Sequence, residues 1–276
     1  MNVLITGCST GIGRAAAERL ARAGMTVYAT ARRPESIEDL KAAGCRTLAL
    51  DVTDEESMRA AVEEVERAEG GVEALVNNAG YSQSGAVETV PLDEVRRQFE
   101  TNVFGLLRMS QLVLPGMRRQ GHGRIVNVSS MGGKLTFPGG GIYHATKHAV
   151  EAISDAMRFE VHGFGVDVVV IEPGLIRTSF ADTSVDSVPR EDGPYAEFNT
   201  AVANATAGAY KGPLGRLGGR PDAVAKTIER ALTADRPRTR YKVTPSARIL
   251  MAQRALLPDR AWDAVVGTSF PRPGRK

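Results

Sequence analysis

The chain has 276 residues, of which 42% are hydrophobic and 24% charged, a composition typical of a soluble globular protein. Its 35 basic and 32 acidic residues give a net charge of +3 without long basic clusters, which argues against a nucleic-acid-binding surface. No stretch approaches the ~20 apolar residues that cross a bilayer, and no signal-peptide pattern is seen. Two cysteines without CxxC spacing predict reduced thiols and a cytoplasmic protein, and four histidines without ligand spacing predict no metal site.

Short β-branched runs alternate with longer helix-like segments. The runs lie at 2–6, 26–31, 46–52, 73–79, 124–130 and 167–173, and a seventh follows at 240–244. Strands that alternate with helices indicate βαβ units and a parallel sheet covered on both faces. We therefore expect an α/β Rossmann-type fold, a doubly wound parallel sheet of about seven strands between two helical layers, in one domain over 1–276.

The first run ends in the glycine-rich stretch TGCSTGIG, residues 6–13. Gly7, Gly11 and Gly13 let the backbone bend tightly and approach a ligand, while the next helix offers unpaired N–H groups and the positive end of its dipole to a pyrophosphate. A loose dinucleotide pattern alone is weak, but this one follows a first strand and opens a βαβ unit. It predicts a dinucleotide-binding loop.

The second run ends in TARR, where Arg32 and Arg33 stand in place of an acid. A carboxylate about 20 residues after the loop would hold the ribose 2′-hydroxyl of NAD, whereas an arginine pairs with the 2′-phosphate of NADP. In isolation, the simpler interpretation is that these are two surface arginines before Pro34. After a dinucleotide-binding loop, binding of the 2′-phosphate is the better interpretation. The sequence predicts NADP(H) in preference to NAD(H), with Arg32 as the main contact.

The later part of the chain contains three further segments that affect the expected site. A helical pattern over 93–121 includes Pro115, which predicts a kink near its end. The segment 178–220 is polar and punctuated by proline and glycine, which predicts an irregular substrate-binding loop or lid. A C-terminal extension follows at about 240–276.

The stretch YHATK, residues 143–147, places Tyr143 and Lys147 one helical turn apart. A tyrosine at a helix start usually packs, a lone lysine is usually solvated, and the serine pair Ser129 and Ser130 upstream is a common strand ending. For each residue considered singly, this structural interpretation is better than a catalytic one. As an ordered set behind a cofactor loop, the residues predict a proton donor and the cation that lowers its pKa.

Together these motifs resemble the short-chain dehydrogenase/reductase family. TGCSTGIG resembles its cofactor loop, NNAG (77–80) its sheet-stabilising motif, and PGLIRT (173–178) the stretch that closes around the nicotinamide. The spacing of 13 residues to Tyr143 selects Ser130 over Ser129. Thr146, where serine is commoner, is a mild departure. Over about 2–180 the likeness is close, and within the family the hydroxysteroid and retinol dehydrogenase branch is the most similar.

The resemblance implies a role for each matching residue. Tyr143 would be the proton donor, Lys147 its tuner and a ligand of the nicotinamide ribose, Ser130 the hydrogen-bond donor to the substrate oxygen, and Asn102 the holder of a relay water. Ser9 and Arg32 would hold the 2′-phosphate, and Asp51 would contact the adenine. The full set expected at the cofactor is Gly7, Ser9, Thr10, Gly11, Ile12, Gly13, Arg32, Asp51, Val52, Asn78, Ala79, Gly80, Tyr143, Lys147, Pro173, Gly174, Ile176 and Thr178.

The function expected is hydride transfer between NADP(H) and a lipophilic carbonyl compound or alcohol, by a homodimer or homotetramer. Two other enzymatic roles stay open: a ketoreductase of acyl or polyketide intermediates, and an aldehyde-detoxifying reductase. A cofactor-binding sensor without catalysis is the alternative from another class, and the intact set of four catalytic residues speaks against it. An apolar substrate pocket has four candidate residues, each of which fits ordinary packing equally well: Met131, Phe137, Phe180 and Tyr195.

Overall fold

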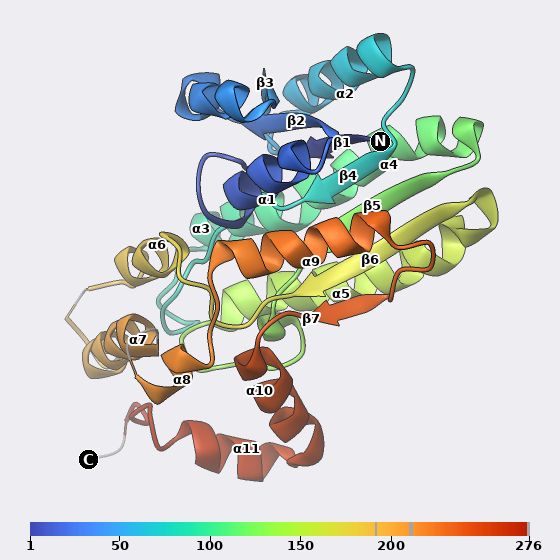
Figure 1. Ribbon diagram of the computed structural model, residues 1–276. Helices are drawn as coiled ribbons and strands as arrows, with labels where there is room; N and C mark the ends of the chain where they lie inside the picture. Colours follow the sequence, from blue (N-terminus) through green and yellow to red (C-terminus); the bar gives the residue numbers. More distant parts are fainter. Residues whose placement is uncertain (191, 210–211, 275–276) are drawn as a thin grey trace.

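A parallel sheet forms the middle layer of the computed structural model, which describes residues 1–190, 192–209 and 212–274 (Figure 1). Its strands pair in the order β3-β2-β1-β4-β5-β6-β7, and every pair is parallel. The strands are β1 Asn2–Ile5, β2 Thr26–Ala31, β3 Arg46–Ala49, β4 Ala74–Asn77, β5 Gly123–Val128, β6 Val166–Glu172 and β7 Arg240–Lys242. The expected doubly wound Rossmann-type sheet is confirmed, and the strand order reverses between the neighbours β1 and β4.

Helices cover both faces of this sheet. One face packs on α1 and α9 in a core that includes Leu20 and Ile228, and the other packs on α2, α4 and α5 in a core that includes Met109 and Met157. The α-helices are α1 Gly11–Arg22, α2 Glu55–Glu69, α3 Leu92–Phe99, α4 Gly105–Gln120, α5 Gly141–Val161, α6 Phe180–Asp186, α7 Ala196–Ala209, α8 Pro213–Arg216, α9 Pro221–Thr233, α10 Pro245–Leu256 and α11 Asp259–Val266. Short 3₁₀ turns lie at η1 Pro34–Ala43, η3 Met131–Gly133 and η4 His162–Phe164, and a π-turn at η2 Glu100–Phe104.

Local chemistry explains where several of these helices begin and end. Asp54 caps α2, because its carboxylate accepts hydrogen bonds from the amides of Glu56 and Ser57, and Gly70 closes the helix in the left-handed region at φ +84°. In α4 the chain continues through Pro115 to Gln120, so this proline does not end the helix. Within the described residues, none of the helices combines the length and the apolar character that crossing a bilayer would require.

The segment 178–220 is more regular than its composition predicts. It contains α6, α7 and α8, separated by short connections, so the expectation of an irregular insertion is wrong for most of its length. Alanines dominate α7, and its apolar side chains Phe198 and Val202 are buried. Proline and glycine mark the helix boundaries here rather than a continuous loop. Residues 191, 210 and 211 of the expected lid lie outside the described residues.

Helix α9 is fixed to the sheet by one arginine of β5. The Arg124 guanidinium donates to the carbonyls of Ala231, Leu232 and Ala234 at 2.8–3.0 Å, and to the carboxylate of Asp167 at 2.7 Å. These carbonyls lie at the end of α9, where helix geometry leaves such groups without intrahelical partners. Arg124 therefore ties the last turn of α9 to β5 and β6.

Candidate active site

The glycine-rich turn lies at the carboxyl end of β1, where the strand order reverses. Gly7 and Gly11 adopt positive φ values of +73° and +60°, which favour glycine strongly. Thr10 precedes α1, and its side chain makes no capping hydrogen bond to the first amides of the helix. A Cβ at Gly13 would lie 2.3 Å from the carbonyl oxygen of Gly7, so only glycine lets α1 approach the turn this closely. The turn has the form of a pyrophosphate cradle.

The NNAG motif holds this turn in place. The Asn78 side-chain amide donates to the carbonyls of Thr6 and Gly7, both at 3.0 Å, and the backbone amides of Asn78 and Ala79 donate to the Thr6 hydroxyl at 3.0 Å. Asn77 points elsewhere and donates to Asn127 and Ser110 inside the protein. Thr6, which the sequence did not single out, is therefore the hydroxyl that fastens β4 to the glycine turn.

Ser9 and Arg32 lie on two backbone segments, the glycine turn and the end of β2, that are hydrogen-bonded to each other. The Cys8 amide donates to the carbonyl of Thr30 at 2.7 Å, which brings the glycine turn beside the end of β2. Ser9 follows that contact by one residue and Arg32 by two, and both are exposed. A hydroxyl and a guanidinium at this edge suit a phosphate ester.

Asp51 and Val52, two of the residues expected at the cofactor, follow β3. The Asp51 carboxylate accepts hydrogen bonds from the backbone amide and the hydroxyl of Thr53 at 2.9 and 2.8 Å, which orients it. Val52 is buried in the core, and its carbonyl would lie 2.5 Å from a Cβ at Gly105. Asp51 thus presents a fixed acceptor and Val52 a fixed backbone.

The PGLIRT stretch crosses in front of the glycine turn. A Cβ at Gly11 would lie 3.3 Å from the methyl of Thr178, and the Ser179 hydroxyl lies 3.4 Å from that of Thr10. Pro173 is fixed through its carbonyl, which accepts from the Met131 amide at 2.8 Å. Gly174 packs against Thr244 and Ser246, and Ile176 is buried beside Gly219. The stretch therefore joins the glycine turn to the loop after β5.

Asn102 lies in the π-turn η2 that connects α3 to α4. Its amide nitrogen donates to the carbonyl of Tyr81 at 2.9 Å and to the hydroxyl of Thr146 at 3.1 Å, and its oxygen accepts from the Tyr81 amide at 3.0 Å. The helical period of 93–121 predicts no such turn, and π-turns are frequent at functional sites. A Cβ at Gly80 would lie 3.0 Å from Asn102 Oδ1 and 3.8 Å from Lys147 Nζ. Asn102 and Lys147 therefore border the same small space.

Lys147 is 6% exposed on the inner face of α5. Its ammonium donates to the carbonyl of Val128, at the end of β5, at 2.9 Å and lies 5.9 Å from the centre of the Tyr143 ring. Burial lowers the pKa of Lys147 to about 8, and the charge of Glu151 opposes that shift. The structure therefore brings the predicted tyrosine and lysine together.

Ser130 lies at the turn from β5 into η3. Its hydroxyl oxygen accepts from the Gly132 amide at 3.0 Å, which leaves its proton available to another acceptor. Tyr143 stands in the first turn of α5, half-buried, with its ring 5.4 Å from that of Phe180. Ser130, Tyr143 and Lys147 thus converge at the carboxyl ends of β5 and β6.

The four apolar residues expected to line a pocket separate in the structure. Phe180 lies against Tyr143, as expected. Phe137 packs on Trp262 at 5.8 Å and Met131 is buried in the same cluster, so these two belong to the contact with α10 and α11. Tyr195 packs against Phe198 and donates to Glu88 at 2.7 Å. The four side chains therefore have different surroundings: Phe180 borders Tyr143, the large side chains of the loop after β5 pack toward α10 and α11, and Tyr195 packs in a separate cluster.

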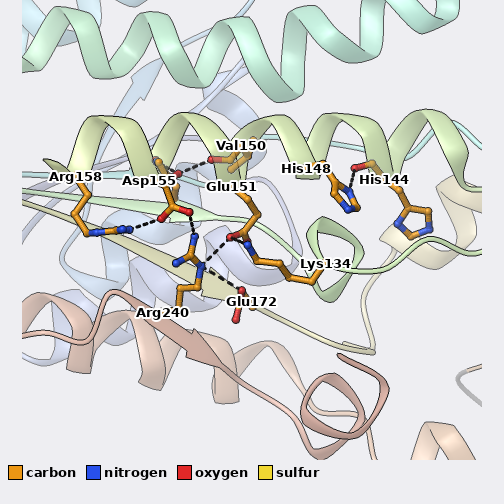
Figure 2. Close-up of polar contacts among 11 residues, drawn as sticks. Lys134, His144, His148, Val150, Glu151, Asp155, Arg158, Glu172 and Arg240 are labelled. Atoms are coloured by element: carbon orange, nitrogen blue, oxygen red, sulfur yellow. Dashed lines mark hydrogen bonds and ion pairs between the residues drawn. The ribbon is translucent and has the colours of Figure 1, made fainter. Parts of the chain in front are cut away.

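A cluster of charged side chains surrounds the buried carboxylates of Glu151 and Glu172 between α5 and the ends of β6 and β7, and the sequence did not predict it (Figure 2). Arg240 donates from Nε to Glu151 at 2.9 Å and from Nη2 to Asp155 at 2.5 Å, and Lys134 Nζ lies 3.0 Å from Glu151 Oε2. Glu172 is fully buried, and Arg240 Nε lies 3.6 Å from its Oε1. Burial first, and then the charge of Glu151, raise the pKa of Glu172 to about 7, against the opposing effect of Arg240.

We expect the stability of this protein to carry a pH dependence from Glu172. The pKa of Glu172 in the folded state lies above its ordinary value of 4.5. Its ionised carboxylate therefore destabilises the fold by the full amount above pH 7, and this destabilisation disappears as the pH falls toward 4.5. Glu172→Gln removes the titration. The difference in free energy of unfolding, variant minus parent, should therefore increase by on the order of 2 kcal/mol as the pH rises from 5 to 8. Urea unfolding of both proteins at each pH measures this, and a constant difference would contradict it.

Comparison with known proteins adds independent observations. The family model for short chain dehydrogenases matches residues 1–188. The NADPH-dependent 3-dehydrocapnine reductase of Ornithobacterium rhinotracheale is 35% identical over 272 residues, covering 95% of this chain and 94% of that protein. Retinol dehydrogenase 5 of Homo sapiens is 33% identical over 289 residues, covering 99% and 90%. A solved short-chain dehydrogenase from Streptomyces avermitilis has a TM-score of 0.81 and 35% identity, covering 97% of this chain and 94% of that one.

Proposed function

Because the chain belongs to the short-chain dehydrogenase family and is an oxidoreductase of that type, we propose that it transfers hydride between NADP(H) and a lipophilic carbonyl compound or alcohol. The observation that carries this proposal is the proximity of Tyr143 and Lys147, with Lys147 bound to the carbonyl of Val128 two residues before Ser130. The similarity to a retinol dehydrogenase and to an NADPH-dependent reductase supports the substrate class and the cofactor.

The residues present fit a dinucleotide. The amides at the start of α1, which no side chain of Thr10 caps, suit the pyrophosphate, and exposed Ser9 and Arg32 suit the 2′-phosphate. Asp51 would hold the adenosine side, Lys147 the nicotinamide ribose, and the stretch from Pro173 to Thr178 the nicotinamide ring. When bound, the nicotinamide supplies the hydride.

The protein's part in the reaction is to move a proton. Tyr143 donates to the substrate oxygen as negative charge develops there, and Ser130 donates a hydrogen bond to the same oxygen. A free phenol has a pKa of about 10, and the nearby cation of Lys147 favours the phenolate that remains. Asn102 and Lys147, which border one space at Gly80, would restore the proton through a held water.

Replacing Arg32 tests the cofactor preference. Arg32→Asp puts a carboxylate where the 2′-phosphate is expected, so we expect the ratio of kcat/KM for NADPH to that for NADH to fall at least tenfold, by about 1.4 kcal/mol or more. The adjacent Arg33→Asp is the matched control, because it adds the same charge one residue away. Initial rates with both cofactors measure the ratio. An unchanged ratio in Arg32→Asp would make the assignment wrong.

A substrate panel tests the reaction class. NADPH oxidation is followed with hydrophobic ketones, retinal-like aldehydes, acyl thioesters bearing a 3-keto group, and short aldehydes. Turnover restricted to the hydrophobic ketones and aldehydes is the expected result. A preference for the thioesters would favour the ketoreductase alternative, and one for short aldehydes would favour detoxification. NADPH binding without turnover of any compound would favour a sensor.

The oligomeric state is part of the same proposal. Phe104 of η2 and Phe159 of α5 are 50% and 88% exposed, and association that buries such side chains is favoured by the hydrophobic effect. We propose a homodimer or homotetramer in which α5 contributes to the contact between subunits. Sedimentation of the parent and of Phe159→Glu tests it, since the added charge should shift the protein toward the monomer.

A further inference from the structure

A cavity separate from the catalytic residues lies behind the loop after β5. Its volume is about 910 Å³, and its walls come from that loop, from α5, from the ends of β6 and β7, and from α10 and α11. Asn102, Ser130, Tyr143 and Lys147 do not line it. Cavities of about 300–1,000 Å³ hold small-molecule ligands in proteins.

The lining of this cavity has two chemically different parts. Apolar side chains of the loop and the C-terminal helices form one part, among them Phe137, Met251 and Trp262. Charged side chains of the cluster described above form the other, among them Lys134, Glu172 and Arg240. Such a lining suits a molecule with a hydrocarbon body and a polar head.

Glu172 identifies the kind of head group. Both of its carboxylate oxygens, and Oε1 of Glu151, lack a hydrogen-bond partner among the described residues. Arg240 Nε lies 3.6 Å from Glu172 Oε1, an ion pair beyond hydrogen-bond distance, because its N–H donates to Glu151 Oε2 (Figure 2). Lys134 also pairs with Glu151 Oε2. A buried carboxylate without donors is costly, whereas a charge-assisted hydrogen bond from a cation stabilises it.

The geometry points to a second ligand site in this cavity, which we propose binds an amphiphilic primary amine. The ammonium would donate to Glu172, and the hydrocarbon part would lie on Phe137 and Trp262. A primary ammonium carries three N–H donors, and Glu172 with Oε1 of Glu151 offers three unpartnered acceptors. The raised pKa of Glu172 agrees with a carboxylate that lacks donors.

The amine reaches Glu172 by displacing one lysine. Glu172 is fully buried, so a neighbouring side chain has to turn outward before a ligand can touch it. The Lys134 side chain is 35% exposed on the cavity wall, and it is an ammonium itself. The ligand therefore exchanges one ammonium for another beside Glu151. Shortening Lys134 should accordingly favour the ligand.

The test uses the single tryptophan of the chain as its reporter. Trp262 lines the cavity, so the fluorescence of the whole protein reports on this site. The full chain is titrated at pH 8 with octylamine, octanol and octanoate below their aggregation limits, and each titration is repeated by calorimetry. We expect saturable binding of octylamine, at least tenfold tighter than that of octanol or octanoate. Binding needs no nicotinamide or turnover, so its outcome is independent of the proposed reaction.

Two variants locate the head group. Glu172→Gln should lower the affinity for octylamine at least tenfold and leave the affinity for octanol unchanged. Lys134→Ala should raise the affinity for octylamine or leave it equal. Circular dichroism verifies that both variants fold, and Asp263→Asn, which neutralises an exposed acid elsewhere on the lining, is the matched control for charge. Octanoate or octanol binding as tightly as octylamine would overturn the proposal. An octylamine affinity that is unchanged in Glu172→Gln would also overturn the proposal, as would the absence of saturable binding in both measurements.

Discussion

Tyr143→Phe is expected to lower kcat for carbonyl reduction by about 10²–10⁴-fold, because the variant keeps the ring and loses the proton that the substrate oxygen receives. The ring contact with Phe180 at 5.4 Å needs no hydroxyl, so the local packing should persist. NADPH affinity should change little, since most of the expected cofactor contacts come from the glycine turn and the PGLIRT stretch. Stopped-flow hydride transfer and NADPH fluorescence titration measure the two quantities separately.

Tyr241→Phe is the matched control for that substitution. It removes the same atom from a tyrosine of β7 whose hydroxyl accepts only a surface amide contact, from Arg238 at 3.1 Å, among the bonds described. Its kcat should stay within about twofold of the parent. If Tyr143→Phe retained kcat as well, the assignment of the proton donor would fail. If both variants lost it together, a general loss of structure would be the cause.

Gly13→Ala is expected to remove cofactor binding and to destabilise the fold. The added methyl would lie 2.3 Å from the Gly7 carbonyl oxygen and 2.4 Å from the side-chain nitrogen of Asn78. Backbone cannot give way there without moving the turn or breaking the Asn78 contacts. We expect a loss of about 1–3 kcal/mol in free energy of unfolding, as for other overpacked sites, and at least a hundredfold loss in NADPH affinity.

Gly163→Ala serves as the control for the added methyl. Nothing lies within 4 Å of a Cβ at Gly163, and its φ is not in the positive range. Urea unfolding and NADPH titration should both match the parent for this variant. Normal NADPH affinity in Gly13→Ala would show that α1 can retreat from the turn, and the cradle described here would then not depend on that glycine.

Much of the fold could be predicted because the five inner strands are short runs of mostly buried side chains, while the edge strands β3 and β7 stay partly exposed. The glycine turn and the Tyr143–Lys147 pair were equally predictable, since local geometry alone places their atoms. The π-turn at Asn102 was not, because the helical period continues across it and the turn is stabilised by contacts with Tyr81 and Thr146.

Long-range partners explain the remaining failures. Glu151 and Glu172 are 21 residues apart in sequence and meet only because α5 packs against β6, so no local pattern marks them as a pair. Phe137 turns toward α11 because Trp262 lies there and donates to the carbonyl of Thr136 at 3.1 Å. A sequence read segment by segment gives no sign of a partner more than 120 positions away.

The attachment of α9 through Arg124 bears on how this chain can be recombined with its relatives. The family match ends at residue 188, which makes that position a tempting crossover point for chimeras. If the segment of this chain beyond residue 188 were joined to the N-terminal part of a relative, its α9 would lose the Arg124 guanidinium that binds its last carbonyls. Asp222 and Glu229 would likewise lose Arg19 of α1. A chimera that takes its C-terminal third from this chain therefore also needs arginine at positions 19 and 124.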